Sequence, residues 1–318
     1  MEPPVFLARR ISPKVALALG LAAGLPILLG AGVGAAPGDS DDPSLRDTSL
    51  RTYSSRSSRF DGFAIGAPHD GFDGYTGRIV YDMGSTLGAG RVRAYGFRSP
   101  WNGLYINVNQ PTEGPLAGRY KDETRTRRAD RVYERYQSAL HKVARTSGAL
   151  DLLIEIHGNS RKETIRGRRR HLTVIECATT GFSRSELRSL HNTWQAEARK
   201  RDLPPLYFEG LPEHETYSYE GERIRFYFRA SSAKERGSLR SSKARRTLHF
   251  ELPREVRYSS SKRAAVTRAL TELAREAWDM SQIKGGSSNS TGSSSSGSSS
   301  SKRTATRSYP WWYYYYFS

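Results

Sequence analysis

The sequence predicts a single α/β domain built on a mixed, mainly parallel sheet with helices on both faces. Short apolar runs alternate with segments whose apolar residues recur at helical spacing, a pattern typical of strand–helix–strand units. With 318 residues, the chain is long enough to bury a large core. Two of the apolar runs end in a histidine closely followed by glycine, at His69 and His157. Because binding groups gather at the carboxyl ends of strands in such folds, we expect the functional site there.

The individual elements follow from the spacing of apolar residues along the chain. The expected strands are residues 63–66, 92–98, 104–109, 152–157, 172–178, 224–228 and 248–252. The expected helices are residues 76–87, 122–146 and 183–200, followed by a last helix that begins at residue 261. Ser183 and Glu186 form a capping-box pattern at the start of the third helix. The basic run 166–170 predicts an exposed hairpin tip.

The two ends of the chain differ in composition from its middle. Residues 1–35 combine a basic start, a weakly apolar run and small residues, which predicts a cleaved signal peptide, with an uncleaved anchor as the alternative. We expect a disordered lead-in over residues 36–59, the folded domain over 60–284, a Ser/Gly linker over 285–301 and a basic-aromatic tail over 302–318. The protein is therefore expected to be secreted, periplasmic or bound to the cell envelope.

The charge of the chain bears on its expected partners, and its single cysteine bears on the core. The formal net charge of +18 makes an anionic envelope polymer a plausible neighbour, although solubility is the commoner reason for such a charge. We expect no specific nucleic-acid partner, and membrane contact only through the N-terminal segment or the aromatic tail. The single Cys177 lies in an apolar run and predicts a buried, inert thiol.

Side chains capable of binding zinc follow the two histidine-ending strands. His69, Asp73 and His157 offer two imidazoles and a carboxylate, the kind of ligand set that leaves one zinc position open in a hydrolase. Asp70 is an alternative carboxylate in the same loop. These residues predict a zinc site.

An ordered set of short motifs resembles the N-formylglutamate amidohydrolase family. The motifs are Pro68-His69-Asp70-Gly71, Gly96-Phe97-Arg98, Ile106–Glu113, Tyr133-Glu134-Arg135-Tyr136, Ile154–Gly158 and Leu248–Pro253. They run from about Phe63 to about Arg257 and cover most of the expected domain. This family is similar in fold to zinc carboxypeptidases and succinylglutamate desuccinylases.

The resemblance implies roles for individual residues. It implies zinc held by His69, Asp73 and His157, with Glu251 as the general base. The carboxypeptidase-type spacing would place the acidic ligand at Phe72, one residue before Asp73, so that Asp70 stays open as a competitor.

The resemblance also implies a pocket that holds a substrate carboxylate. The family's Asn-Arg pair is Asn109-Gln110 here, so Arg98 is the expected substitute, because a guanidinium binds a carboxylate with two hydrogen bonds. Arg98 is thus expected, with Glu251, to be a catalytic residue that anchors the substrate and stabilises charge. Asn107, Asn109, Thr112 and Glu113 are the other residues expected to bind substrate. Glu155 and Glu176, inside apolar strands, either support the histidines or point to solvent, and for Glu155 we expect the first.

Together these observations predict an exported zinc-dependent hydrolase that cleaves an amide bond. The expected substrate is an acyl-amino acid or a peptide-like molecule, such as a cell-wall peptide or polyglutamate. The alternative is a non-catalytic, basic cell-surface protein that binds an anionic polymer or a glycan. Zinc content distinguishes the two, because only the enzyme requires the metal.

Overall fold

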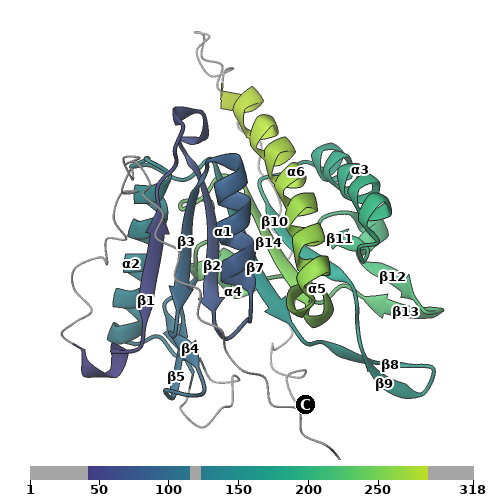
Figure 1. The fold of residues 1–318 in the computed structure, drawn as a ribbon, viewed down its shortest axis with the longest axis horizontal. Helices are drawn as coiled ribbons and strands as arrows, with labels where there is room; N and C mark the ends of the chain where they lie inside the picture. The colour runs from purple at the N-terminus through teal and green to yellow at the C-terminus, as the bar shows by residue number, and fades with distance from the viewer. Residues whose placement is uncertain (1–41, 115–122, 286–318) are drawn as a thin grey trace, which may run out of the picture. The chain divides into compact units, whose positions relative to one another are not determined.

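The centre of the fold is a mixed β-sheet. The computed structural model describes residues 42–114 and 123–285, and its main sheet has seven strands in the order β1-β3-β2-β7-β14-β10-β11 (Figure 1). These strands are β1 (Ser49–Tyr53), β2 (Phe63–Asp70), β3 (Gly90–Tyr95), β7 (Leu152–Asn159), β10 (Ile175–Thr180), β11 (Leu206–Phe208) and β14 (Thr247–Pro253). Strands β3, β2, β7 and β14 are parallel, whereas β1 is antiparallel to β3 and β10 is antiparallel to β14. The predicted fold class is confirmed.

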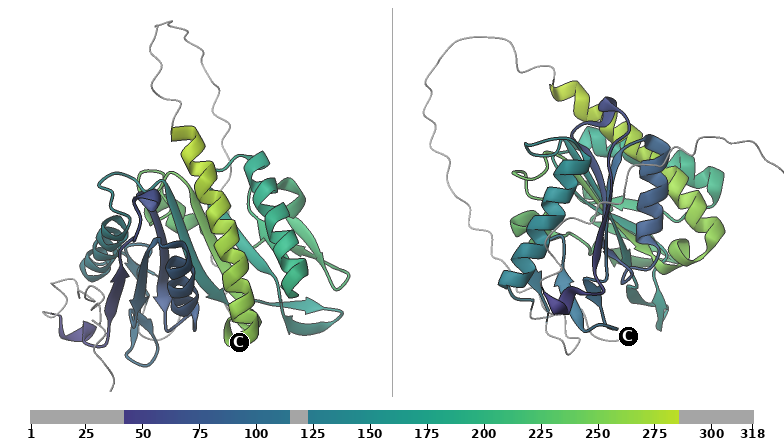
Figure 2. Two further views of the ribbon diagram at one scale, coloured as in Figure 1. Left: turned by 45° about the horizontal axis from the view of Figure 1, so that its top comes forward. Right: turned by 60° about the vertical axis from the view of Figure 1, so that its left-hand side comes forward.

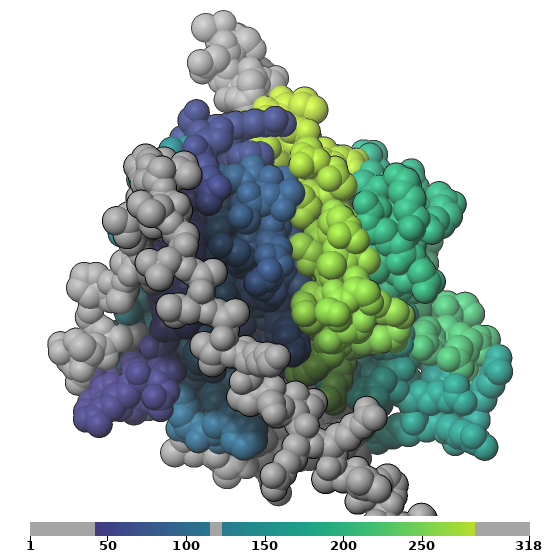
Figure 3. All heavy atoms as spheres, in the orientation of Figure 1, coloured from purple at the N-terminus to yellow at the C-terminus, as the bar shows by residue number. Residues whose placement is uncertain are grey.

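Helices cover both faces of this sheet (Figure 2). One face carries α2 (Arg127–Val143) and the short α4 (Ser231–Arg236). The other face carries α1 (Thr76–Leu87), α3 (Arg184–Arg201), α5 (Arg254–Tyr258) and α6 (Ser260–Gly285). Figure 3 looks onto this second face, where α6 packs against both α1 and α3. Each face has its own apolar core, so the central strands are buried on both sides.

The smaller elements form hairpins and short turns. Strands β4 (Arg98–Ser99), β5 (Leu104–Asn107) and β6 (Thr112–Glu113) make one small sheet, β8 (Lys162–Ile165) pairs with β9 (Arg168–His171), and β12 (Thr216–Tyr219) pairs with β13 (Glu222–Arg225). Short 3₁₀ helices lie at Pro43–Leu45, Ser58–Phe60 and Pro212–His214. The β8–β9 turn has positive φ at Arg166 and Gly167, so Arg166 lies at the hairpin tip as predicted, whereas residues 168–170 belong to the exposed strand β9.

The expected lead-in is partly wrong. Ser49–Tyr53 forms β1 at the edge of the sheet, and Leu50 is buried in the core beneath α2. An edge strand exposes much of its surface and therefore tolerates the polar composition that suggested disorder. The signal peptide, residues 36–41 of the lead-in, the linker after Gly285 and the tail lie outside the described residues. Among the residues that the structure describes, no helix is long and apolar enough to cross a membrane.

Several predicted boundaries shift, among them those of β2, β3, β5 and β10, and two further shifts have clear local causes. Helix α2 begins at Arg127 because the Thr126 side chain accepts a hydrogen bond from the Ala129 N–H at 3.1 Å. Strand β13 ends at Arg225, before the predicted end at residue 228, because the backbone N–H groups of Tyr227 and Phe228 bind a carboxylate instead of a neighbouring strand. That carboxylate belongs to Glu176, described below.

Candidate metal centre

The candidate residues lie on the α2 face of the sheet, near the carboxyl ends of β2, β7 and β14. Along β7, Ile154 and Ile156 pack on the α1–α6 side, so the alternating Glu155 and His157 face α2. Strand β14 is parallel to β7 and pairs Glu251 with His157. Residues paired in this way project from the same face of a sheet, so the predicted base and the predicted ligand are neighbours.

A β-bulge turns His69 toward the same face. Between Ala67 and Asp70, the β2 register shifts by one residue relative to β3. Gly71 follows at φ +95°, a backbone conformation that favours glycine. The Asp73 N–H then donates to the His69 carbonyl at 2.9 Å, which folds the loop back over the strand end. Asp73 is brought beside His69 in this way.

The three predicted ligands converge on one point. The Nδ1 atoms of His69 and His157 are 3.2 Å apart, and Asp73 Oδ2 lies 3.4 Å from the first and 3.6 Å from the second. Tetrahedral zinc, with ligand bonds of about 2.0–2.1 Å, separates neighbouring ligand atoms by about 3.3 Å. All three residues are buried. Their chemistry and spacing therefore fit a zinc ion.

The structure separates the two candidate aspartates. Asp70 accepts hydrogen bonds from Arg93, with Nε at 2.9 Å and Nη2 at 2.8 Å. Its carboxylate packs against the start of α1, where a Cβ on Gly77 would lie 2.1 Å from Asp70 Oδ2. Asp70 therefore faces away from the histidines, and Asp73 is the carboxylate beside them.

Electrostatics at this point favour a cation. Burial alone would lower the pKa of His157, but hydrogen bonding to Asp73 and Glu155 raises it to about 10. Burial alone would also raise the pKa of Asp73, but its interactions with the two histidine rings, first of all with His157, hold it below its usual value. Burial lowers the pKa of His69, which keeps that imidazole neutral. The carboxylates that stabilise a proton on His157 would equally stabilise a metal ion.

Each histidine also has a partner on the side away from the candidate metal position. Asn107 Nδ2 donates to Glu123 at 3.0 Å, so Asn107 Oδ1 faces His69 Nε2 at 2.8 Å. We therefore assign the His69 proton to Nε2, which leaves the Nδ1 lone pair for a metal. Glu155 Oε2 lies 3.6 Å from His157 Nε2, beyond hydrogen-bond distance but close enough for an ion pair with the protonated ring.

Glu155 is fully buried and anchored from α2. Its two oxygens accept hydrogen bonds from Tyr136 Oη at 3.2 Å and from Asn109 Nδ2 at 3.1 Å. Gly66 leaves room for this contact, because a Cβ there would lie 2.1 Å from Tyr136 Oη. Asn109, expected to bind substrate, contacts this carboxylate. Glu155 thus lies beside His157, the position that its expected supporting role requires.

His249 joins the two carboxylates and was missed from the sequence. Its ring stacks on His157 with centroids 4.0 Å apart, and its Nε2 lies 3.3 Å from Glu251 Oε1. Its Nδ1 lies 3.6 Å from Glu155 Oε2, so Glu155, His157 and His249 form a second close group of metal-binding side chains. Because both Glu155 oxygens already accept hydrogen bonds, we assign this group to orienting His157. The alternation of Leu248-His249-Phe250-Glu251 was the available signal.

The residues expected to bind substrate do not all lie together. Arg98 Nη2 lies 3.8 Å from Glu123 Oε1, and Thr112 Oγ1 donates to Glu123 at 2.9 Å. Glu113 instead pairs with Arg128 of α2. Glu123 is the residue that joins this region, and nothing in its sequence context indicated that.

Glu176 has a structural role of its own. Its carboxylate accepts hydrogen bonds from Arg161 Nη1 and Tyr217 Oη, both at 2.7 Å, and from the backbone N–H groups of Tyr227 and Phe228. These bonds attach the β12–β13 region to β10. Glu176 therefore neither supports the histidines nor points to solvent.

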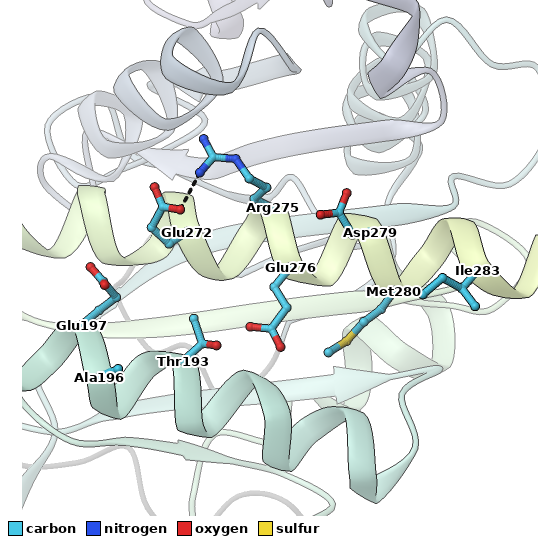
Figure 4. A pocket seen from close by; sticks show the side chains of 9 residues that line it. All are labelled: Thr193, Ala196, Glu197, Glu272, Arg275, Glu276, Asp279, Met280 and Ile283. Carbon is cyan, nitrogen blue, oxygen red and sulfur yellow. Dashed lines mark hydrogen bonds and ion pairs between the residues drawn. The ribbon is translucent and has the colours of Figure 1, made fainter.

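A separate surface hollow lies between α3 and α6 (Figure 4). It has a volume of about 500 Å³, and its lining includes the acidic Glu197, Glu272, Glu276 and Asp279. None of the nine residues drawn there belongs to the metal centre. The chemistry described above therefore lies elsewhere.

Comparison with known proteins gives only weak similarities. No protein-family model and no curated protein matches this chain. A solved structure of a bacteriophage poly-gamma-glutamate hydrolase is similar at 10% identity and a TM-score of 0.34, over 75% of this chain and 89% of that one. A zinc-free structure of YNDL gives 12% identity, a TM-score of 0.37 and coverage of 75% and 92%. The structure of a gene product of Agrobacterium tumefaciens is similar at 14% identity and a TM-score of 0.38, over 74% of this chain and 96% of that one. At these values the similarities assign neither family nor function.

Proposed function

We propose that this chain is an exported zinc-dependent amidohydrolase. One observation carries the proposal: His69, Asp73 and His157 converge at zinc-like spacing on the face of the sheet that also carries Glu251. Export is proposed from residues 1–35, which lie outside the described part of the chain. The proposed substrate is an acyl-amino acid or a peptide-like amide, such as a wall peptide or polyglutamate.

Each residue has a distinct part in the proposed reaction. His69, Asp73 and His157 would hold the zinc, which when bound polarises a carbonyl and lowers the pKa of water. Glu251, whose side chain is 13% exposed, can take a proton from the attacking water and pass it to the leaving amine. His249 holds the Glu251 carboxylate from one side, and Arg98 is proposed to anchor a substrate carboxylate.

The metal is tested with two histidine variants. We expect the purified protein to contain about one zinc per chain, measured by mass spectrometry of metals. His157→Ala should lose the zinc, whereas the exposed His171→Ala on β9 should keep it. A protein that contains no zinc and binds none when zinc is supplied would contradict the proposal.

The reaction is tested with Glu251→Gln. This variant should retain zinc, because Glu251 is not among the proposed ligands. It should lose about 10²–10⁴-fold in kcat on an acyl-amino acid or wall-peptide amide that the unmodified protein hydrolyses. Zinc retained together with an unchanged kcat would remove Glu251 from the mechanism.

A further inference from the structure

Glu123 sits in a set of hydrogen-bond donors of a kind that proteins present to a carboxylate ligand. Glu123 Oε2 accepts hydrogen bonds from Gln110 Nε2 and Thr112 Oγ1, both at 2.9 Å, and from Asn107 Nδ2 at 3.0 Å. The Arg98 guanidinium lies 3.8 Å from the other oxygen. We call Arg98, Asn107, Gln110 and Thr112 the donor cluster.

The donor cluster adjoins the metal centre. Asn107 contacts both sides, since its Oδ1 faces His69 Nε2 at 2.8 Å while its Nδ2 donates to Glu123. The Arg98 guanidinium lies 4.9 Å from the centre of the Phe72 ring, next to Asp73 in the ligand loop. A group bound at the donor cluster would therefore lie one side chain away from the proposed zinc ligand His69.

The chemistry of the cluster matches an anion better than a neutral group. Three uncharged donors and a guanidinium converge on one pair of oxygens, and charge-assisted hydrogen bonds of this kind are strong and directional. The Asn107, Gln110 and Thr112 side chains are buried, and those of Arg98 and Glu123 are only 14% exposed. An acidic side chain thus fills a carboxylate site beside the proposed reaction centre.

We infer that Glu123 is an internal competitor of substrate, because it occupies the donor cluster until a substrate carboxylate takes its place. This inference rests on the proposed function, in which Arg98 anchors a substrate carboxylate. Glu123 then competes with substrate, and the apparent affinity for a carboxylate is reduced by the fraction of molecules in which Glu123 occupies the site. Removing Glu123 should raise that affinity.

Glutarate binding to the full-length, zinc-loaded protein tests the inference by isothermal titration calorimetry. Glu123→Ala should bind glutarate at least tenfold more tightly than the unmodified protein, and adding Arg98→Ala should abolish the gain. Neutral glutaramide should show no gain. Glu197→Ala is the matched control, because it removes a carboxylate that is likewise held by basic side chains, on α3. Unchanged glutarate affinity in folded Glu123→Ala, or an equal gain in Glu197→Ala, would overturn the inference.

Glu123→Gln keeps the test decisive if the alanine variant does not fold. It preserves the shape of the side chain but removes its charge, so glutarate affinity should rise by a smaller factor. Equal affinities for Glu123→Gln and the unmodified protein would overturn the inference. Zinc content and hydrolysis, measured on the same samples, separate the two proposals. Tighter glutarate binding without zinc or hydrolysis supports the subsite alone, whereas hydrolysis with unchanged glutarate binding supports the enzyme alone.

Discussion

Arg257 connects the three segments that carry the candidate metal centre. It lies on α5 directly after β14, and it is 4% exposed. Its guanidinium donates to the carbonyls of Gly74 at 2.7 Å, Leu252 at 3.1 Å and Asn159 at 3.4 Å. These carbonyls lie next to Asp73, next to Glu251 and two residues after His157. We therefore predict that Arg257→Met destabilises the whole site.

The size of the effect follows from the hydrogen bonds. Those made by a charged group contribute about 1.5–3 kcal/mol each to stability, and a buried carbonyl that loses its donor adds a desolvation cost. The bond to Gly74 is short, the bond to Leu252 has an ordinary length, and the bond to Asn159 is near the limit of hydrogen-bond distance. Methionine keeps part of the apolar packing but none of the donors. We expect the free energy of unfolding to fall by about 3–4 kcal/mol.

Urea unfolding, with and without a zinc chelator, measures this change. Arg245→Met is the matched control, because Arg245 pairs with Asp151 at the surface with a side chain that is 69% exposed. Its removal should cost less than about 1 kcal/mol. Zinc affinity should fall only in Arg257→Met. A loss below about 1 kcal/mol in Arg257→Met, or equal losses in both variants, would refute the reasoning.

Three further predictions concern the layers around the site. Gly66→Ala should lower the free energy of unfolding in urea by about 1–3 kcal/mol, because the new Cβ would lie 2.1 Å from Tyr136 Oη. The control Gly148→Ala should lower it little, because a Cβ there would have no atom within 4 Å. Similar losses in the two variants would argue against the contact. Glu155→Gln should weaken zinc binding about 10–100-fold in a chelator competition, and an unchanged affinity would remove Glu155 from the support of the ligands. Burial lowers the pKa of His214 from 6.5 to about 4. The neutral ring therefore contributes about 3 kcal/mol to the free energy of unfolding above pH 6.5, and this contribution is lost as the pH falls to about 4. His214→Gln should flatten the dependence of stability on pH over this range, and an unchanged slope would contradict the assignment.

The sequence was most informative where spacing and burial act together. Apolar runs and helical periodicity located the central strands and the four long helices, because each element must bury a continuous apolar stripe. The same logic placed His69 and His157 at strand ends. Their convergence required β2 and β7 to be neighbours, and the structure has them paired in parallel.

Residues that act through loop geometry were beyond this reasoning. Glu123 lies 16 residues from Asn107 in the sequence. Only the fold of β4–β6 and the segment after it brings the carboxylate oxygens of Glu123 to the side-chain amide of Asn107. Asn107 was expected to bind substrate, yet one end of its side chain supports His69. Spacing along a chain predicts faces of regular elements, but it carries no information on where irregular segments meet.

The choice between Asp70 and Asp73 illustrates the same limit at a single residue. Strict alternation along β2 would place His69 with Phe63, Ile65 and Ala67 on the α1–α6 side, away from His157. Between Ala67 and Asp70, however, three steps on β2 oppose two steps on β3, which inverts the alternation after the bulge.

His69 therefore turns to the face of His157, while Asp70 shares the other face with its partner Arg93. Pro68 lies inside this bulge, and proline, which cannot donate a ladder hydrogen bond, is found within sheets at edges, strand starts and bulges. A proline within an apolar strand just before a predicted ligand is thus a signal that the alternation inverts there. With that inversion, Asp70 faces away from the candidate metal position. The next carboxylate, Asp73, is the proposed ligand, because the loop returns over the strand end and brings it within 3.4 Å of His69 Nδ1.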